Sequence, residues 1–505
     1  MISRVKICAV VAAADARSMW TQVRRALDVT RTIELRLDWL SDDAEIAKFL
    51  ARLRASQRAN PERATLIATC RRRQAGGKFT GTIAKQLVHL AEAIRAGCDW
   101  YDLEIETSSA CPPELLDVLL GEGRQMSSAH FFERTDKNLK RVAVDLARTR
   151  PDAIKIAAQC NSLVESMDVL RLAHGRKNVV AVPMGGVALP ARVLALREGS
   201  ALAYAPVQNA TAPGQVTLDA MKHLYRADRL RRKTRVYGVI GDPIGHSLSP
   251  VLQNAGFQAR QMDAVFLPFL VRDLKDFLRA IGPLGIAGFS VTIPHKEAIL
   301  RHLDDRDPMA AAIGAVNTVV VRGGGKLYGY NTDYVGVLRA LERRIPLRGS
   351  RALICGAGGA ARAVAFALAE SGAVVCVCAR RMKQAKALAR VVGGEAVERP
   401  RLRREFFDAI VNATPVGMYP HSDRAPLRAE ELNCRLVFDL IYRPRSTKLL
   451  QIASRRGIET VSGIEMFVAQ GTAQWEIWTG ERAPESAMRR AVLRALHNEE
   501  KMAAR

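Results

Sequence analysis

The first half of the chain alternates short apolar runs with amphipathic stretches. Eight runs predict strands, at 7–11, 33–37, 65–70, 101–105, 126–130, 153–158, 179–184 and 201–207. Between most of them lie stretches with helical periodicity, such as 43–55, 83–96 and 163–174. Strand and helix alternating eight times predict a (β/α)8 barrel, the TIM fold, over residues 1–228. The alternative for the same elements is a doubly wound open sheet.

The second half predicts another α/β module. A buried strand at 352–355, a glycine-rich turn, a helix at 363–370 and a further strand at 373–378 indicate a Rossmann lobe over 341–465. A first lobe over 236–340 precedes it, and helices over 466–505 return toward that first lobe. The short basic linker at 229–235 contains no Gly/Ser-rich spacer.

The glycine-rich turn reads Gly356-Ala357-Gly358-Gly359-Ala360. Glycines at its first and third positions let the backbone turn sharply and approach a pyrophosphate, which then binds free N–H groups at the helix start. The motif alone is a weak signal. Its place between a buried strand and a helix favours a dinucleotide site.

The end of the strand at 373–378 indicates which dinucleotide binds. The residue there faces the adenosine ribose, and this chain has Arg380 and Arg381. An acidic residue suits the 2′-hydroxyl of NAD, whereas guanidinium groups suit the 2′-phosphate of NADP. The sequence predicts NADP, and the alternative is a solvated basic loop.

Five polar residues before this turn are candidates for substrate chemistry: Ser247, Ser249, Lys296, Asn317 and Asp333. Each also has a structural interpretation. Ser249 precedes a proline at a predicted helix start and would cap that helix, and Asp333 taken alone is typical of a helix cap. Lys296 follows a strand-like stretch at 290–293, so it would project from a strand end as a site residue should.

Taken together, these pieces resemble the shikimate dehydrogenase family from residue 236 to about 480. The matching motifs are VIGDPIGHSLS at 239–249, VTIPHK at 291–296, GAVN at 314–317, NTD at 331–333, GAGGA at 356–360, NATPVGM at 412–418, DLIY at 439–442 and MFVAQ at 466–470. The resemblance implies NADP-dependent reduction of 3-dehydroshikimate to shikimate.

The same resemblance assigns roles to individual residues. Lys296 and Asp333 would be the catalytic pair, since hydride delivery to a ketone leaves an alkoxide that must be protonated. A coupled pair of this kind titrates as a unit. The substrate would contact Ser247, Ser249, Thr292, Asn317, Tyr442 and Gln470, and the cofactor would contact the turn from Gly356 through Ala357, Gly358 and Gly359 to Ala360, together with Arg380, Arg381, Thr414, Met418 and Gly463.

In the predicted barrel, polar residues gather where active sites form, near the carboxyl ends of strands. They are Glu34, Arg36, Arg71, His130, Lys155, Arg192 and Gln215. Lys155 lies inside an apolar run, so it either reaches solvent or is desolvated. Desolvation lowers the pKa of an amine, which frees it to attack a ketone and form a Schiff base. His130 could serve the same substrate as base and acid, although either residue alone has an equally good structural interpretation.

Residues 1 to about 228 resemble the type I 3-dehydroquinate dehydratase family. The motifs are ELR at 34–36, Arg71 ahead of paired glycines, SAH at 128–130, IKI at 154–156, Arg192 and TAPGQ at 211–215. By this resemblance Lys155 forms the Schiff base, His130 moves protons during loss of water, and Arg192 pairs with the substrate carboxylate. Hydroxyl groups of 3-dehydroquinate would be oriented by Glu34, Arg36, Arg71, Thr211 and Gln215.

The chain departs from that family at two positions. Ala75 stands where the family has a Glu that orients the catalytic histidine, and Phe131 stands where an Asp often follows that histidine. The departures imply a less well held His130 and a slower dehydratase. Glu104 or Glu106 could substitute for the missing carboxylate.

Composition narrows the remaining classes. A formal charge of +25 would suit nucleic acid, but the basic runs are scattered and lack interleaved aromatic residues, and both substrates and NADP are anionic. We expect small-molecule substrates and no nucleic-acid partner. The competing interpretation is a regulator that reuses these domains without activity, and a third is a dehydrogenase that prefers quinate or NAD.

Nine cysteines without a C-x-x-C pair indicate a reducing compartment, the cytoplasm, and no metal site. The N-terminus lacks a targeting pattern, and no uncharged stretch is apolar enough for a membrane span.

Overall fold

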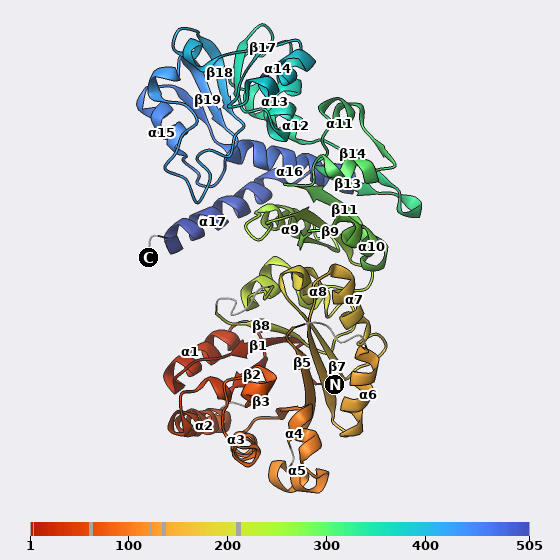
Figure 1. Cartoon of the computed structure of the whole chain (residues 1–505). Helices are drawn as coiled ribbons and strands as arrows, with labels where there is room; N and C mark the ends of the chain where they lie inside the picture. Colours follow the sequence, from red (N-terminus) through yellow and green to blue (C-terminus); the bar gives the residue numbers. More distant parts are fainter. Residues whose placement is uncertain are drawn as a thin grey trace. The chain divides into compact units, whose positions relative to one another are not determined.

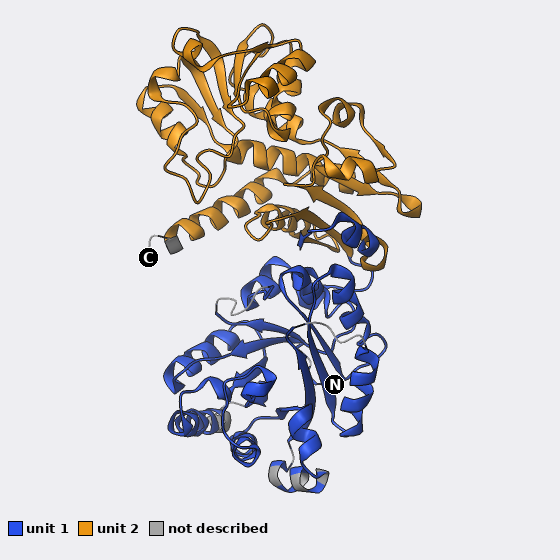
Figure 2. Ribbon diagram, viewed as in Figure 1, with its two compact units in different colours: residues 1–234, 269–280 blue, residues 235–268, 281–505 orange. Residues whose placement is uncertain are grey.

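The computed structural model describes residues 2–3, 5–59, 64–121, 123–133, 138–208 and 214–503. The chain forms two compact units (Figure 2). The first consists of Met1–Thr234 with Phe269–Ala280, and the second of Arg235–Pro268 with Ile281–Arg505. The finer domain boundaries given above stay predictions.

The first unit is a parallel eight-stranded barrel, as predicted, in which strands adjacent in sequence pair around the ring in the order β7-β6-β5-β4-β3-β2-β1-β8. The ring closes near β7 and β8, where the Ala201 N–H donates to the Val179 carbonyl at 2.8 Å. The open-sheet alternative is wrong, because a doubly wound sheet reverses its strand order at a switch point. The strands are β1 Ile7–Val11, β2 Thr32–Arg36, β3 Thr65–Thr69, β4 Trp100–Glu104, β5 Arg124–Phe131, β6 Ala153–Gln159, β7 Val179–Met184 and β8 Ala203–Pro206.

Helices surround this barrel (Figure 1). Several of them begin at a capping side chain. Asp15, Thr82 and Ser162 each accept a hydrogen bond from the backbone N–H of the residue three positions later. The helices are α1 Ala16–Leu27, α2 Asp43–Ala59, α3 Ile83–Arg95, α4 Ile105–Ala110, α5 Pro113–Leu120, α6 Leu139–Arg148, α7 Leu163–Arg171 and α8 Leu189–Leu194.

The predicted linker is attached to the first unit. The guanidinium of Arg232 pairs with Glu198 at 3.0 Å, and the Arg232 carbonyl accepts a hydrogen bond from Arg197. Glu198 is 8% exposed and also binds Arg197 at 2.6 Å. Charged residues in this linker are therefore held by a buried carboxylate.

The second unit contains two six-stranded sheets. In the first sheet, β9 and β11 are parallel, and β13 runs antiparallel to both β11 and β14. Its order is β10-β9-β11-β13-β14-β12. Its strands are β9 Arg235–Gly241, β10 Ala264–Leu270, β11 Ile286–Val291, β12 Asp305–Arg306, β13 Thr318–Val321 and β14 Leu327–Tyr330.

The second sheet is fully parallel, with the order β17-β16-β15-β18-β19-β20. Strand order reverses between β15 and β18, which is the Rossmann arrangement, so the predicted dinucleotide-binding fold is confirmed. Its strands are β15 Arg351–Cys355, β16 Val374–Cys378, β17 Glu395–Ala396, β18 Phe407–Asn412, β19 Cys434–Asp439 and β20 Glu459–Val461.

Helices connect and cover these sheets (Figure 1). The predicted C-terminal helical region is present as two helices, which separate at Gly480 in a left-handed conformation. The helices are α9 Ser249–Ala259, α10 Leu274–Leu284, α11 Pro308–Ile313, α12 Asp333–Leu341, α13 Gly359–Glu370, α14 Met382–Val391, α15 Lys448–Arg455, α16 Gly463–Thr479 and α17 Glu485–Ala503. Residues 274–280 of α10 belong to the first unit.

Candidate active sites

Side-chain alternation along the barrel strands builds the first site. Trp100, Met126 and Ala153 belong to one apolar cluster, and each lies on a different strand. Two residues further along the same strands stand Asp102, Ser128 and Lys155. Because side chains two apart point to the same side of a strand, a polar layer follows the apolar layer inside the barrel. The sequence pattern therefore buries charged groups on top of an apolar floor.

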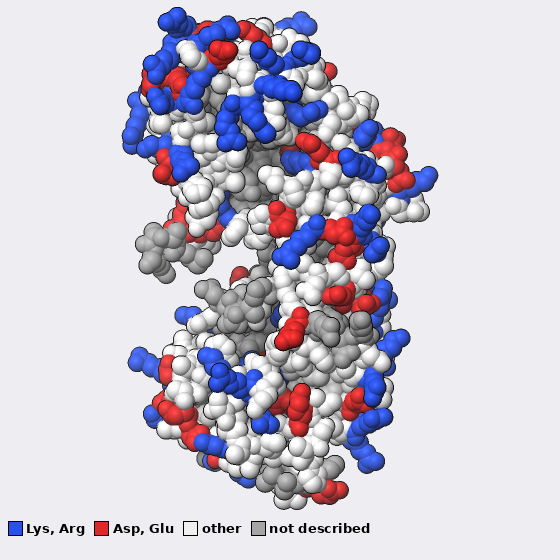
Figure 3. All heavy atoms as spheres, in the orientation of Figure 1, with Lys and Arg blue, Asp and Glu red and all other residues white. Residues whose placement is uncertain are grey.

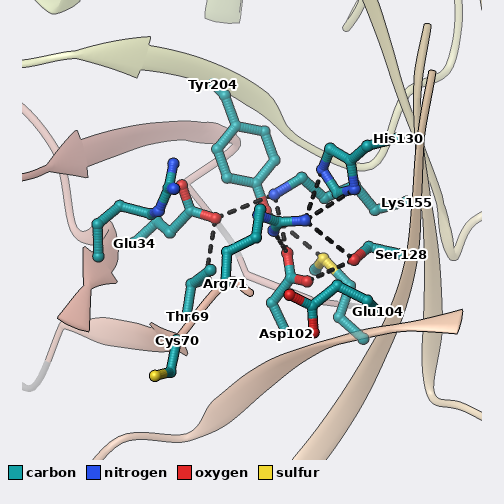
Figure 4. A network of polar contacts seen from close by, with 12 residues as sticks. Glu34, Thr69, Cys70, Arg71, Asp102, Glu104, Ser128, His130, Lys155 and Tyr204 are labelled. Atoms are coloured by element: carbon teal, nitrogen blue, oxygen red, sulfur yellow. Dashed lines mark hydrogen bonds and ion pairs between the residues drawn. The ribbon is translucent and has the colours of Figure 1, made fainter. Parts of the chain in front are cut away.

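Lys155 is the cation of this polar layer (Figure 4). The residue is 5% exposed, and its Nζ donates to Glu34 Oε1 and Asp102 Oδ2, both at 2.9 Å. Its Nζ also lies 4.1 Å from the centroid of the Tyr204 ring. Of the two alternatives for a lysine in an apolar run, the structure shows the desolvated one. The Lys155 amine thus lies inside the barrel between two carboxylates.

Asp102 joins the lysine to the rest of the cluster. Its Oδ2 also accepts from Arg71 Nη2 at 2.8 Å, and its Oδ1 accepts from Ser128 Oγ at 2.6 Å. Burial opposes ionisation, but Arg71 and Lys155 hold the pKa of this carboxyl well below its usual range. Sequence reasoning missed Asp102. The signal was available, because an acidic residue inside a buried strand is as unusual as the lysine in β6.

His130 lies beside Arg71, whose Nη1 is 2.7 Å from both ring nitrogens. Burial, followed by the charges of Arg71 and Lys155, holds the pKa of His130 well below its usual value. A guanidinium can only donate, so the imidazole is neutral and accepts through one nitrogen. Figure 4 shows Lys155, Asp102, Arg71 and His130 as one connected network.

No described carboxylate replaces the acid that the family places beside this histidine. Glu104 accepts from the Arg72 N–H at 2.8 Å and from Gln86 Nε2 at 2.7 Å, so the hypothesis that Glu104 orients the imidazole is wrong. Glu106 is exposed. The ring of Phe132 stacks on His130 instead, with centroids 6.0 Å apart and 15° between the planes.

The remaining predicted residues of this site differ in their surroundings. Arg36 is held by Asp38 through two hydrogen bonds of 2.9 and 2.8 Å. Arg192 is 9% exposed and donates to the Tyr204 carbonyl at 3.5 Å, and burial lowers its pKa to about 10. Within the described part of the chain no acid pairs with Arg192, which leaves its charge available to a substrate carboxylate. Gln215 is partly buried, and Thr211 lies outside the described residues.

The second site brings together a lysine, a carboxylate and an amide from three segments. Lys296 Nζ donates to Asp333 Oδ2 at 2.5 Å, and Asn317 Nδ2 donates to Asp333 Oδ1 at 2.8 Å. Asp333 is the first residue of α12 and has 9% of its side chain exposed, against 22% for Lys296. Its carboxylate is thus committed to these two donors, and the helix-cap interpretation is wrong.

The other predicted substrate residues of this unit come from several segments of the chain. Ser249 is the first residue of α9, and its N–H donates to Ser247 Oγ at 3.2 Å, so the prediction that the Ser249 side chain caps the helix is wrong. Tyr442 stacks on Phe467 with centroids 4.6 Å apart, and burial raises the pKa of its hydroxyl. Thr292 follows β11, and its N–H donates to the Ile240 carbonyl at 3.0 Å.

Gln470 lies on α16, which approaches α12 closely. A Cβ at Gly336 would lie 2.9 Å from the Met466 side chain and 3.2 Å from Gln470, so only glycine permits this approach. Gln470 Nε2 donates to the Phe467 carbonyl at 2.8 Å. A close helix pair therefore carries Gln470 and Asp333 on neighbouring elements.

The glycine-rich turn fits a dinucleotide. Gly356 has a φ of +117°, which favours glycine, and a Cβ there would lie 3.1 Å from the Ala413 carbonyl. Gly358 and Gly359 face open space, where a Cβ would obstruct a phosphate approaching the start of α13. The turn from Gly356 to Ala360 follows β15, at the point where the strand order of the sheet reverses.

The other predicted cofactor residues follow strands of the same sheet. Arg380 and Arg381 follow β16 and are exposed. Thr414 and Met418 follow β18, and Met418 is 46% exposed. Gly463 begins α16, where a Cβ would lie 2.3 Å from the Leu440 carbonyl. The segments that follow β16, β18 and β20 thus lie at the carboxyl edge of the parallel sheet, the edge at which the glycine-rich turn also lies.

The described residues offer neither a metal site nor a membrane-spanning helix. No group of three or more His, Cys, Asp and Glu residues among them could hold a metal ion. In the same part of the chain, every helix is too short or too polar to cross a membrane.

Three family models match the chain. They are type I 3-dehydroquinase over residues 7–231, the shikimate dehydrogenase substrate binding domain over 239–319 and the shikimate 5′-dehydrogenase C-terminal domain over 463–493. A bifunctional 3-dehydroquinate dehydratase/shikimate dehydrogenase, chloroplastic, from Arabidopsis thaliana is 33% identical, covering 95% of this chain and 82% of its own length.

Other similar proteins match the second half. Shikimate dehydrogenase (NADP(+)) from Methanothermobacter thermautotrophicus is 44% identical over 53% of this chain and 99% of its own. A crystal structure of shikimate dehydrogenase in complex with NADP+ has a TM-score of 0.50 and 38% identity, covering 53% of this chain and 97% of that one. A chorismate mutase/shikimate 5-dehydrogenase fusion protein from Clostridium acetobutylicum also has a TM-score of 0.50, with 30% identity over 53% of this chain and 99% of its own.

A first prediction concerns the histidine. Ala75→Glu should raise the pKa of His130, because a nearby carboxylate favours the protonated imidazole. NMR titration of labelled histidines, with His130→Gln to assign the signal, measures this shift. Ala75→Gln is the control of equal size. An equal shift in both variants would show that charge at position 75 is not the cause.

Proposed function

The chain belongs to the bifunctional 3-dehydroquinate dehydratase/shikimate dehydrogenase family, and from that membership we propose that Lys155 and Lys296 each carry one of its two reactions. The enzyme dehydrates 3-dehydroquinate to 3-dehydroshikimate and reduces this product to shikimate with NADPH, two consecutive steps of the shikimate pathway. The observation that supports the assignment of residues is the lysine of each unit, which is held by carboxylates at hydrogen-bond distance.

In the dehydratase reaction, Lys155 acts through a Schiff base. Glu34, one of its two carboxylate partners, takes the proton from the ammonium, and the free amine attacks the ketone of 3-dehydroquinate, which loses its oxygen as water when the imine forms. Neutral His130 then removes a proton from the substrate and returns one to the departing hydroxyl as water leaves. A second water hydrolyses the imine, which releases 3-dehydroshikimate and regenerates the Lys155 amine. Arg192 binds the substrate carboxylate, and the other predicted residues orient the hydroxyl groups.

In the dehydrogenase reaction, bound NADPH supplies the hydride that reaches the ketone. The Lys296–Asp333 pair protonates the resulting alkoxide, and Asn317 keeps the second carboxylate oxygen in place by its hydrogen bond. We assign the proton donor to the pair and not to one member, because the two groups are in direct contact. Ser247, Ser249 and the other predicted substrate residues bind shikimate.

We propose that the basic surface does not bind nucleic acid. Arginines of the run at 399–404 are occupied by acids: Arg399 pairs with Glu431, Arg401 with Glu395 and Glu405, and Arg403 with Glu430. Figure 3 shows acidic side chains interleaved with Lys and Arg on one face of the molecule. Part of the positive charge has another use, because a positive potential steers the anionic substrates and NADPH to the sites.

We also propose a cytoplasmic location. All nine cysteines are free thiols, and six of them are buried. Free thiols are typical of a reducing compartment.

An absorbance assay tests both assignments. With 3-dehydroquinate and NADPH, the wild type should consume NADPH. Lys155→Ala should fail with 3-dehydroquinate yet keep its rate with 3-dehydroshikimate. Lys296→Ala should lose about 10²–10⁴-fold in kcat with 3-dehydroshikimate, the usual contribution of a positioned acid or base. The two variants are controls for each other, and a Lys296→Ala defect confined to KM would contradict the proton-donor role.

Borohydride trapping tests the imine directly. The wild type with 3-dehydroquinate should give a covalent adduct on Lys155, which mass spectrometry of the digested protein locates. Lys155→Arg keeps the charge but should give no adduct. Absence of an adduct in an active wild type would rule out the Schiff-base route.

Cofactor preference tests the arginines after β16. Arg380→Ala should raise KM for NADPH about tenfold and leave KM for NADH unchanged, because only NADPH carries the 2′-phosphate that a charge-assisted hydrogen bond recognises. Arg404→Ala, an exposed arginine of the same sheet region, is the control. Equal effects on both cofactors would contradict the assignment.

A further inference from the structure

Asp439 ends β19 and has a buried carboxylate that the two reactions do not use. The residue is 0% exposed and accepts three hydrogen bonds: from Asn412 Nδ2 at 3.0 Å, from the Ile441 N–H at 3.1 Å and from Thr447 Oγ1 at 2.6 Å. Burial raises its pKa to about 6, and within the described part of the chain no cation pairs with it. Burying a carboxylate costs free energy unless hydrogen bonds compensate for the lost water, and here three donors from three segments converge on it.

On one side, Asp439 holds the segment that follows β18. Asn412, its neighbour across the sheet, turns its own Oδ1 toward Thr414, accepting from the Thr414 N–H at 3.0 Å and from its hydroxyl at 2.7 Å. This segment lies directly against the glycine-rich turn, since a Cβ at Gly356 would be 3.2 Å from Thr414 Cγ2. The carboxylate therefore sets the shape of the loop next to the pyrophosphate turn.

On the other side, Asp439 holds the segment that carries Tyr442. Its bond to the Ile441 N–H fixes the residue just before Tyr442. That segment rests on the start of α16, because a Cβ at Gly463 would lie 2.3 Å from the Leu440 carbonyl and 2.6 Å from that of Ile441. Tyr442 then stacks on Phe467 of the same helix, three residues before Gln470. One side chain is thus hydrogen-bonded to a cofactor-side loop and to a substrate-side loop.

We propose that Asp439 is a positioning residue that sets the cofactor-side loop at Asn412–Thr414 and the substrate-side loop at Tyr442 together. The proposal rests on the dehydrogenase function given above and extends it. Without the carboxylate, both loops lose the same support, so affinity for NADPH and affinity for 3-dehydroshikimate should fall together.

The decisive variant is Asp439→Ala. Its KM for NADPH and its KM for 3-dehydroshikimate should each rise about tenfold, more than kcat falls, because several hydrogen bonds that shape the two binding loops are lost. Asp439→Asn should restore both values to within about threefold of the wild type, since the amide oxygen keeps two donors and the NH₂ group can donate to the Thr447 hydroxyl. Asp423→Ala, an exposed aspartate of the same unit, is the matched control.

Two further measurements separate the possible outcomes. Wild type that oxidises no NADPH with 3-dehydroshikimate would overturn the proposed function itself. An active wild type whose Asp439→Ala variant behaves like Asp423→Ala, or changes only one of the two KM values, would overturn the role of Asp439.

If near-ultraviolet circular dichroism shows that Asp439→Ala is unfolded, the Thr447→Val variant decides, because it removes one of the three bonds. Both KM values should rise about threefold, and unchanged values would overturn the proposal.

Discussion

The ammonium of Lys155 between two buried carboxylates is the interaction on which the first unit depends. A lysine, Glu34, Asp102 and Arg71 lie together in a barrel interior where each charge alone would be strongly disfavoured. Removing one partner of such a cluster leaves an uncompensated buried charge, at a cost of about 3–5 kcal/mol. The barrel interior tolerates these charges because each of them has a buried partner of opposite charge. The same partners keep the Lys155 amine away from solvent and next to carboxylates. Stability and reactivity have the same origin at this site.

The dehydrogenase unit applies a milder form of the same arrangement. Lys296 is paired with Asp333, but 22% of its side chain is exposed, and its partner is oriented by a neutral amide. In the proposed mechanism this lysine delivers a proton, whereas Lys155 loses one and forms a bond. A partly exposed ion pair can take up a proton from solvent after each turnover, while the burial of Lys155 limits the access of water to the proposed imine.

The Rossmann sheet places cofactor chemistry at its switch point, between β15 and β18. Gly356 there turns the chain in a conformation that favours glycine, and Asn412 and Asp439 fix the loops beyond the next two strands. Backbone shape and buried polar bonds, not surface charge, form the part of the site nearest the turn. The exposed Arg380 is the residue that we propose discriminates between the two nicotinamide cofactors.

The sequence by itself determined the elements and much of the chemistry. All eight barrel strands, the strands on either side of the glycine-rich turn and the C-terminal helical region follow from local periodicity, and the motifs identified Lys155, His130, Lys296 and Asp333. Tertiary structure decided which groups touch. Asp102 contacts Lys155, 53 residues away, only because β4 and β6 both face the barrel interior. Glu104 accepts a hydrogen bond from Gln86 and does not contact the histidine. The side chains of Ser249 and Asp333 do not cap helices. Asp439 is hydrogen-bonded to residues of two loops, which the sequence did not indicate. Periodicity is local and can be read along the chain, whereas hydrogen-bond partners depend on distances that exist only after distant strands pack.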